Sequence, residues 1–492
     1  GDVACHVYAE LVVRDLDLPR FTAAWQRAID RHPMLRAVIA ADGTQRILQT
    51  VPPFVIACAD HADAPREVAE AAATATREAM SHQVLPTDRW PLFDVRVTRL
   101  RDDDWRVHLG IDALILDGES NNRLLQEVFD DYRGYGVPKP SPSGAATFRD
   151  YVLAVQQPDA ALTQAEAYWS ARLASFPPPP ALPLAVDPGV LADGRFARLH
   201  ARIEAPQWRS LKERAAALGL TPSNVLMTAY AEVLGTWATS DDFTLNLTVG
   251  DRRPLAPEVA GMLGVFTNLV PLEMRAVRTG AFTQRARAQQ LQLAADLDHR
   301  AFSGVEVQRR IAARAGDPAA GLLPVVFTSV LGEAQAELPD DVIDVVHAIT
   351  QTPQTWLDNK VYEIGGTALG IDWDAPAALF PSGLLDTLFE AYVSLLQTLA
   401  DDEAAWEDTG RTLSPPAQRA LFDAVNATAG PLGGELLHEP VLAAARAHPG
   451  AVAIIAEGRS YDFATLHAGV RQLATRLRAV LRDDDALVAV VM

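Results

Sequence analysis

Helix and strand patterns alternate along most of this 492-residue chain, and a proline-rich stretch at 176–183 divides the alternation into two halves. In the first half, Phe21, Trp25 and Ala28 recur at helical spacing, and residues 93–98 alternate between apolar and polar. Consecutive prolines favour an extended chain, which suits a crossover between two lobes. We therefore predict a mixed α/β (α+β) fold built from two lobes of comparable length.

The composition excludes several classes of protein. Apolar residues make up 49% of the chain and charged residues 22%, which is ordinary globular composition. The formal net charge of -20 argues against nucleic acid and anionic membranes as partners. No apolar run approaches the roughly 18 residues that cross a bilayer. With only two cysteines, a disulfide framework is excluded as well, and we expect a cytoplasmic protein.

The sequence lacks the usual metal and nucleotide motifs. Paired cysteines and a His-Glu-x-x-His helix are missing, and the 11 histidines are scattered. The glycines of 365–370 stand in a hairpin pattern rather than at the start of a helix, so they do not form a dinucleotide fingerprint. We expect no metal site and no directly bound cofactor.

Two carboxylates interrupt an apolar segment at 108–120. Asp112 ends a predicted strand on the face opposite its apolar residues, and Asp117 lies five positions further on, at the start of a predicted helix. Carboxylates in such surroundings need partners or a polar channel. On spacing alone, a helix cap at Asp117 and a solvent-facing Asp112 also explain the pattern.

The pattern Asp112-x-x-x-x-Asp117-x-x-Ser120 resembles the signature of heterocyclization domains of nonribosomal peptide synthetases. These are relatives of condensation domains, whose motif is His-His-x-x-x-Asp-Gly. When the two motifs are aligned on Asp117-Gly118, Asp112 and Ala113 stand where the two histidines would be. The resemblance implies two chloramphenicol-acetyltransferase-like lobes in a V-shaped pseudo-dimer, with a tunnel between them.

Further segments resemble the same family in the same order along the chain. They are 31–36, 182–184, 221–234, 327–332 and 351–358. Two segments depart from the family pattern: Gly250-Asp251-Arg252-Arg253-Pro254 replaces Phe-Asn-Arg-x-Pro, and 264–272 is closer to ordinary condensation domains.

After the second lobe, the chain resembles the opening of an adenylation domain at 436–439, 451–454 and 460–466. The resulting domain prediction has four parts: 1–175 as the first lobe, 176–410 as the second lobe, 411–436 as a linker and 437–492 as the adenylation fragment. The last residues, 487–492, have an apolar strand pattern, and we expect both ends to be cuts within a longer protein.

The resemblance also implies roles for individual residues. Asp358 is predicted to be the acid/base of cyclodehydration, assisted by Thr328, while Gln354 and Asp112 are predicted to orient the substrate. Each of the two catalytic candidates has a structural alternative: Thr328 as a strand residue that satisfies its own backbone, and Asp358 as a loop cap.

A second group of residues is predicted to be structural. Asp117, in one motif with Ser120, is expected to brace the two lobes by pairing with Arg252, and loss of one member of such a pair strands a buried charge.

The implied partners are upstream and downstream peptidyl carrier proteins, whose phosphopantetheine carries the substrates, and an adenylation domain in cis. Three interpretations remain open. The first is a heterocyclase that forms a thiazoline or oxazoline from Cys, Ser or Thr. The second is an amide-only condensation catalyst, favoured by residues 268–272 and opposed by Ala113. The third is a non-catalytic docking scaffold for carrier proteins, which Thr328 and Asp358 argue against.

Overall fold

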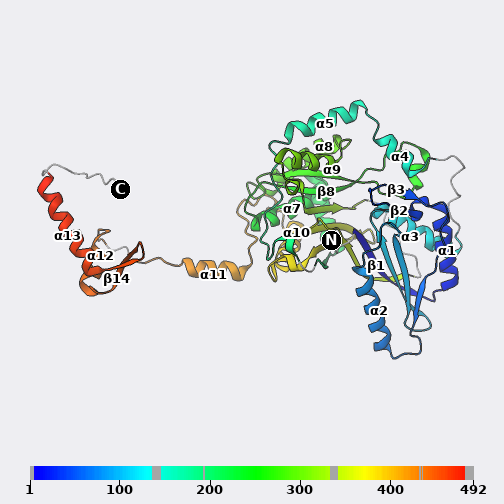
Figure 1. The fold of residues 1–492 in the computed structure, drawn as a ribbon, viewed down its shortest axis with the longest axis horizontal. Helices are drawn as coiled ribbons and strands as arrows, with labels where there is room; N and C mark the ends of the chain where they lie inside the picture. The colour runs from blue at the N-terminus through cyan, green and yellow to red at the C-terminus, as the bar shows by residue number, and fades with distance from the viewer. Residues whose placement is uncertain are drawn as a thin grey trace. The chain divides into compact units, whose positions relative to one another are not determined.

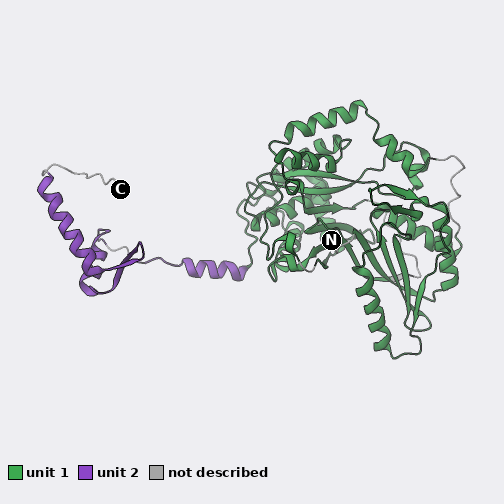
Figure 2. Ribbon diagram, in the orientation of Figure 1, with its two compact units in different colours: residues 1–415 green, residues 416–492 purple. Residues whose placement is uncertain are grey.

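A computed structural model describes residues 5–135, 146–191, 194–332, 342–430, 434 and 436–481. Contacts divide the chain into two compact units, residues 1–415 and 416–492 (Figure 2). The strand pattern noted at 487–492, and part of the predicted linker, lie outside the described residues. Across the described ranges, no helix is long and apolar enough to span a membrane.

A five-stranded sheet forms the first lobe, in the order β11-β1-β6-β5-β4 (Figure 1). Its strands are β1 (His6–Arg14), β4 (Ala57–Asp60), β5 (Phe93–Arg99), β6 (Asp104–Asp112) and β11 (Val342–Gln351). Helices α1 (Leu18–Arg31) and α3 (Gly118–Arg133) cover one face with a shared apolar core. Helix α2 (Arg66–Ser81) lies on the other face, where Arg77 forms an ion pair with Glu10 of β1. A short hairpin, β2 (Ala37–Ile39) and β3 (Gln45–Ile47), adjoins this lobe.

A six-stranded sheet forms the second lobe, in the order β7-β13-β12-β10-β8-β9. Its strands are β7 (Phe196–Ile203), β8 (Phe243–Gly250), β9 (Thr267–Met274), β10 (Val325–Ser329), β12 (Leu357–Ile364) and β13 (Ala368–Pro376). One face is packed against helices α6 (Ala205–Ala217), α7 (Pro222–Trp237) and α10 (Leu384–Asp401). Tyr230 of α7 meets Trp373 of β13 edge-on at 5.3 Å, so the main core of the lobe lies on this side.

One strand from the second half of the chain joins the sheet of the first lobe. The sequence predicts a strand near 346–352 within the second lobe, and the structure contains it as β11, but β11 pairs antiparallel with β1 in the first sheet, with Tyr8 opposite Ile349. The backbone N–H of Thr350 then donates to Asp374 of β13 in the second sheet. Local patterning predicts a strand but cannot identify its neighbour, because strand pairing is a long-range choice.

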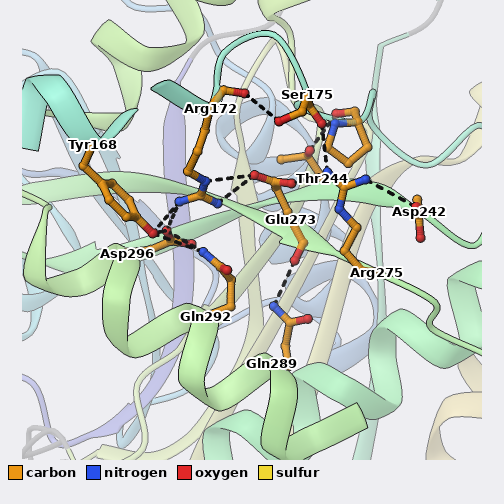
Figure 3. Close-up of polar contacts among 11 residues, drawn as sticks. Tyr168, Arg172, Ser175, Asp242, Thr244, Glu273, Arg275, Gln289, Gln292 and Asp296 are labelled. Carbon is orange, nitrogen blue, oxygen red and sulfur yellow. Dashed lines mark hydrogen bonds and ion pairs between the residues drawn. The ribbon is translucent and has the colours of Figure 1, made fainter. Parts of the chain in front are cut away.

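The segment that links the lobes is fixed to the second sheet by a charge network (Figure 3). Helices α4 (Phe148–Val155) and α5 (Ala160–Arg172) precede the prolines. Arg172 donates to Glu273 of β9 at 2.7 Å and forms an ion pair with Asp296 of α8 (Phe282–Asp298). Beyond them, Thr244 of β8 donates to the carbonyl of Pro177 at 2.6 Å, so the crossover is held along β8 and β9.

Helix α9 (Gly304–Ala315) also belongs to the first unit and packs near β9. The second unit contains helices α11 (Pro416–Asn426), α12 (Glu439–Ala447) and α13 (Phe463–Val480) with a small hairpin of β14 (Val452–Ala456) and β15 (Arg459–Asp462). Several large apolar side chains of this unit are exposed, and Leu437 is 99% exposed.

Candidate active site

Three polar side chains form a hydrogen-bonded chain across three neighbouring strands of the second sheet. Strand β10 lies between β8 and β12 and is parallel to both, with Thr328 opposite Thr248 and Val326 opposite Asp358. Alternate residues of a strand share one face, so Thr248, Thr328 and Asp358 all point away from the helix-covered core. Thr248 Oγ1 donates to Thr328 Oγ1 at 2.7 Å, and Thr328 Oγ1 donates to Asp358 Oδ1 at 3.2 Å.

The surroundings of Asp358 bring the pKa of its carboxyl close to neutral pH. Burial, followed by the negative charge of Asp374, raises the pKa of Asp358 to about 6. The ammonium of Lys360, the hydrogen bond from Thr328 and the guanidinium of Arg198 oppose this shift. The side chain is nevertheless half-buried rather than sealed, so it remains accessible. A carboxyl with these properties can both donate and accept protons near neutral pH.

Asp374 and Arg198 are parts of the site that sequence reasoning missed. Asp374 of β13 lies directly opposite Asp358 in the antiparallel pair, and Arg198 of β7 donates to both of its oxygens, at 2.8 Å and 2.5 Å. Arg198 also donates to Asp372 at 2.9 Å. The alternation Asp372-Trp373-Asp374 was the available signal, because two acids separated by one residue share a strand face.

The two residues predicted to orient the substrate lie in different surroundings. Asp112 is only 3% exposed, which corrects the solvent-facing interpretation. Its Oδ1 accepts from the N–H of Leu114 at 2.9 Å, and burial raises the pKa of its carboxyl. Gln354 lies exposed on the turn between β11 and β12. Their substrate-orienting roles remain predictions.

Asp117 connects the lobes, but not through the predicted ion pair. As the N-cap of α3 it accepts from the N–H of Ser120 at 2.9 Å, and its second oxygen accepts from the N–H of Phe266, in the second half of the chain, at 2.7 Å. Arg252 instead forms an ion pair with Glu119 at 3.1 Å and donates to Ser120 Oγ at 3.2 Å. The predicted Asp117–Arg252 pair is wrong, because the guanidinium of Arg252 is directed to Glu119, Ser120 and backbone carbonyls instead.

The described part of the chain contains no group of three or more His, Cys, Asp or Glu side chains placed to hold a metal ion. Near Asp358, the carboxylate of Asp374 already accepts hydrogen bonds from Arg198. The polar groups of the site are thus hydroxyls, carboxyls and two cations.

Comparison with known proteins agrees with this fold. The family model described as a condensation domain matches residues 4–422, which is most of the chain. This chain belongs to the condensation-domain family. Its two lobes accordingly form the chloramphenicol-acetyltransferase-like pseudo-dimer that the sequence resemblance predicted, and that prediction is confirmed.

Similar proteins include a synthetase and a synthase that are both much longer than this chain. Pyochelin synthetase PchF of Pseudomonas aeruginosa is 37% identical over 99% of this condensation domain chain, which spans 26% of PchF. Phenyloxazoline synthase MbtB of Mycolicibacterium paratuberculosis is 34% identical over 100% of the chain, which spans 42% of MbtB. The chain therefore spans less than half the length of either relative.

A solved structure, the EpoB cyclization-docking bidomain of a nonribosomal peptide synthetase from Sorangium cellulosum, resembles this condensation domain closely. It is 35% identical, with a TM-score of 0.73, and the match covers 82% of each chain.

Proposed function

We propose that this condensation domain is a heterocyclization domain of a nonribosomal peptide synthetase. It would join an upstream carrier-bound acyl or peptidyl thioester to carrier-bound Cys, Ser or Thr and then cyclodehydrate the product to a thiazoline or oxazoline. The observation that carries the proposal is the hydrogen bond from Thr328 to Asp358, a carboxyl whose pKa is raised to about 6. The names of MbtB and of the EpoB domain, a phenyloxazoline synthase and a cyclization domain, support it.

The first reaction, amide formation, joins an amine to an activated thioester and releases the carrier thiol. Holding the two reactants together can supply much of the rate, because proximity converts a bimolecular step into a unimolecular one. This step places no strong demand on a titrating side chain.

Ring closure has a different requirement. The side-chain thiol or hydroxyl adds to the new amide carbonyl, and the resulting hydroxyl must leave as water while the nitrogen loses its proton to form the C=N bond. One proton is given to the departing oxygen and one is taken from nitrogen. Asp358 is proposed to give a proton to the departing oxygen and to take the proton from nitrogen, and Thr328 is proposed to orient Asp358.

The proposal also covers the partner proteins and the division of the chain into domains. Upstream and downstream peptidyl carrier proteins would deliver both substrates on phosphopantetheine. Residues 437–492 would begin an adenylation domain after a linker at 411–436, with lobes at 1–175 and 176–410, of which the second contributes β11 to the sheet of the first. The reaction would take place in the cytoplasm and would use no cofactor bound to this domain.

Mass spectrometry of the carrier-bound product tests the function. The domain is supplied with an acyl-loaded upstream carrier and with downstream carriers loaded with Cys, Ser or Thr. We expect a product one water lighter than the linear amide with at least one of the three. Linear amide alone with all three would establish an amide-only catalyst, and no condensation product would indicate a docking scaffold.

A further inference from the structure

The hydroxyl of Thr248 has no assigned part in the proposed reaction, although it contacts the site. We propose that Thr248 is a positioning residue that directs the hydroxyl proton of Thr328 onto Asp358. The inference rests on the proposed function and extends it to a third side chain. Thr248 acts on Thr328 and is not proposed to touch the substrate.

The argument begins with the number of protons available. A threonine hydroxyl has one proton to donate and two lone pairs that accept. Thr248 Oγ1 donates to Thr328 Oγ1 at 2.7 Å and so occupies one lone pair of Thr328. The single proton of Thr328 is then free to point at Asp358 Oδ1, which lies 3.2 Å away.

The position of Thr248 is fixed by the sheet. It lies in register with Thr328 on the adjacent parallel strand, and its neighbour Leu247 is 5% exposed in the core on the opposite face. Strand β8 is itself flanked by β9 and β10, so it cannot slide without breaking two ladders. As a β-branched residue, Thr248 also has a restricted side-chain torsion.

The hydroxyl of Thr328 can rotate about its C–O bond and so can present its proton or its lone pairs in different directions. Among the described residues, its hydrogen-bond partners are Thr248 and Asp358. The proton that Thr248 donates therefore selects the orientation in which the proton of Thr328 points at Asp358.

A consequence for the carboxyl follows. The hydrogen bond from Thr328 is one of the interactions that lower the pKa of Asp358 against the effect of burial. A hydroxyl that turns away from Asp358 removes this contribution. Loss of the Thr248 hydroxyl should thus raise the pKa of Asp358 further, in the same direction as loss of Thr328.

The test compares Thr248→Val, which keeps the shape and deletes the hydroxyl, with Thr248→Ser, which keeps the hydroxyl. Thr244→Val is the matched control, because Thr244 lies on the same strand and face but donates to the carbonyl of Pro177. The full synthetase is loaded with both substrates, and the ring and linear products are measured over a range of pH. Melting temperatures establish that each variant is folded.

We expect Thr248→Val to slow ring closure roughly tenfold, less than the 10²–10⁴-fold available from a positioned proton transfer. The apparent pKa of this step should move upward, and amide formation should be unchanged. Thr248→Ser and Thr244→Val should keep the parent ratio of ring to linear amide and the parent pH profile. Should Thr248→Val fail to fold, Thr248→Ala deletes the same hydroxyl with a smaller side chain and is expected to show the same loss.

Two results overturn the assignment alone while the proposed function stands. In the first result, the unsubstituted protein forms rings, and a folded Thr248→Val or Thr248→Ala variant closes rings at the same rate and with the same pH profile. In the second result, Thr248→Ser slows ring closure as much as Thr248→Val does. A parent that yields only linear amide overturns the proposed function, and the role of Thr248 with it.

Discussion

At the scale of single residues, the pKa of Asp358 reflects competing neighbours. Burial and the charge of Asp374 raise it, while Lys360, Thr328 and Arg198 lower it, and the balance lies at about 6. Removing a neighbour that raises the pKa should lower it, and removing one that lowers the pKa should raise it. Replacing Asp358 itself is therefore the most direct test of the proposed acid/base role.

Replacement of Asp358 should separate the two chemical steps. Asp358→Ala and Asp358→Asn are expected to accumulate linear amide, because ring closure loses roughly 10²–10⁴-fold in rate without the positioned acid/base. Thr328→Ala should shift the products the same way but less. Since a group that both gives and takes protons works best near its own pKa, the parent ring-closing rate should be highest near pH 6. Quenched-flow mass spectrometry measures both steps, and an equal fall of amide and ring in every variant would contradict the acid/base role.

The same carboxyl should make stability depend on pH. Its folded-state pKa of about 6 lies above the usual value, so the folded protein binds the proton more tightly than the unfolded chain does. This contribution is fully present below about pH 4 and is lost as the pH rises through about 6. At pH 8, Asp358→Asn should therefore be more stable than the parent, by at most about 3 kcal/mol, with little difference below pH 4. Denaturant unfolding of the two proteins at both pH values measures this.

At the scale of elements, helix α3 begins where the two halves of the chain meet. Asp117 caps the helix and also binds the N–H of Phe266, so one side chain serves both a local and a long-range contact. Ser120 and Arg252 contribute further hydrogen bonds at the same place. The start of α3 is therefore coupled to the segment that leads into β9.

Asp117→Ala should cost roughly 2–4 kcal/mol of stability, the sum of a lost helix cap and a buried N–H left without a partner. Asp17→Ala is the matched control, because Asp17 caps α1 through the N–H of Arg20 but is exposed. We expect the control to lose only about 1 kcal/mol. Thermal unfolding measures the difference, and equal losses would show that the contact with Phe266 contributes nothing.

Helix α5 depends on its last residue, Arg172, which holds Glu273 and the fully buried Asp296 (Figure 3). Arg172→Met should cost about 3–5 kcal/mol, because it leaves the buried carboxylate of Asp296 without its cation, while Glu273 keeps its ion pair with Arg275. Arg172→Lys keeps the charge but not the forked geometry, and we expect an intermediate loss. Denaturant midpoints measure the series, and a fully stable Arg172→Met would contradict this account.

At the scale of the whole molecule, the first unit depends on β11, a strand that leaves the second half of the chain to complete the first sheet. Residues 1–175 alone would lack β11 and leave β1 as an unpaired edge. Such edges associate with other chains. We expect this fragment to aggregate when expressed alone and to form a monodisperse complex when co-expressed with residues 176–415, as size-exclusion chromatography with light scattering would show.

The sequence by itself determined the alternation of elements, the division into two lobes and the placement of Thr328 and Asp358 in matched motifs. These follow from periodicity and from local motifs, which are properties of neighbouring residues in the chain. The tertiary structure alone decided that β11 joins the first sheet, that Arg252 pairs with Glu119, and that Thr248 and Asp374 adjoin the site. Each of these depends on which strand or loop lies beside which, and no local pattern encodes that pairing because it is selected by the packing of the whole unit.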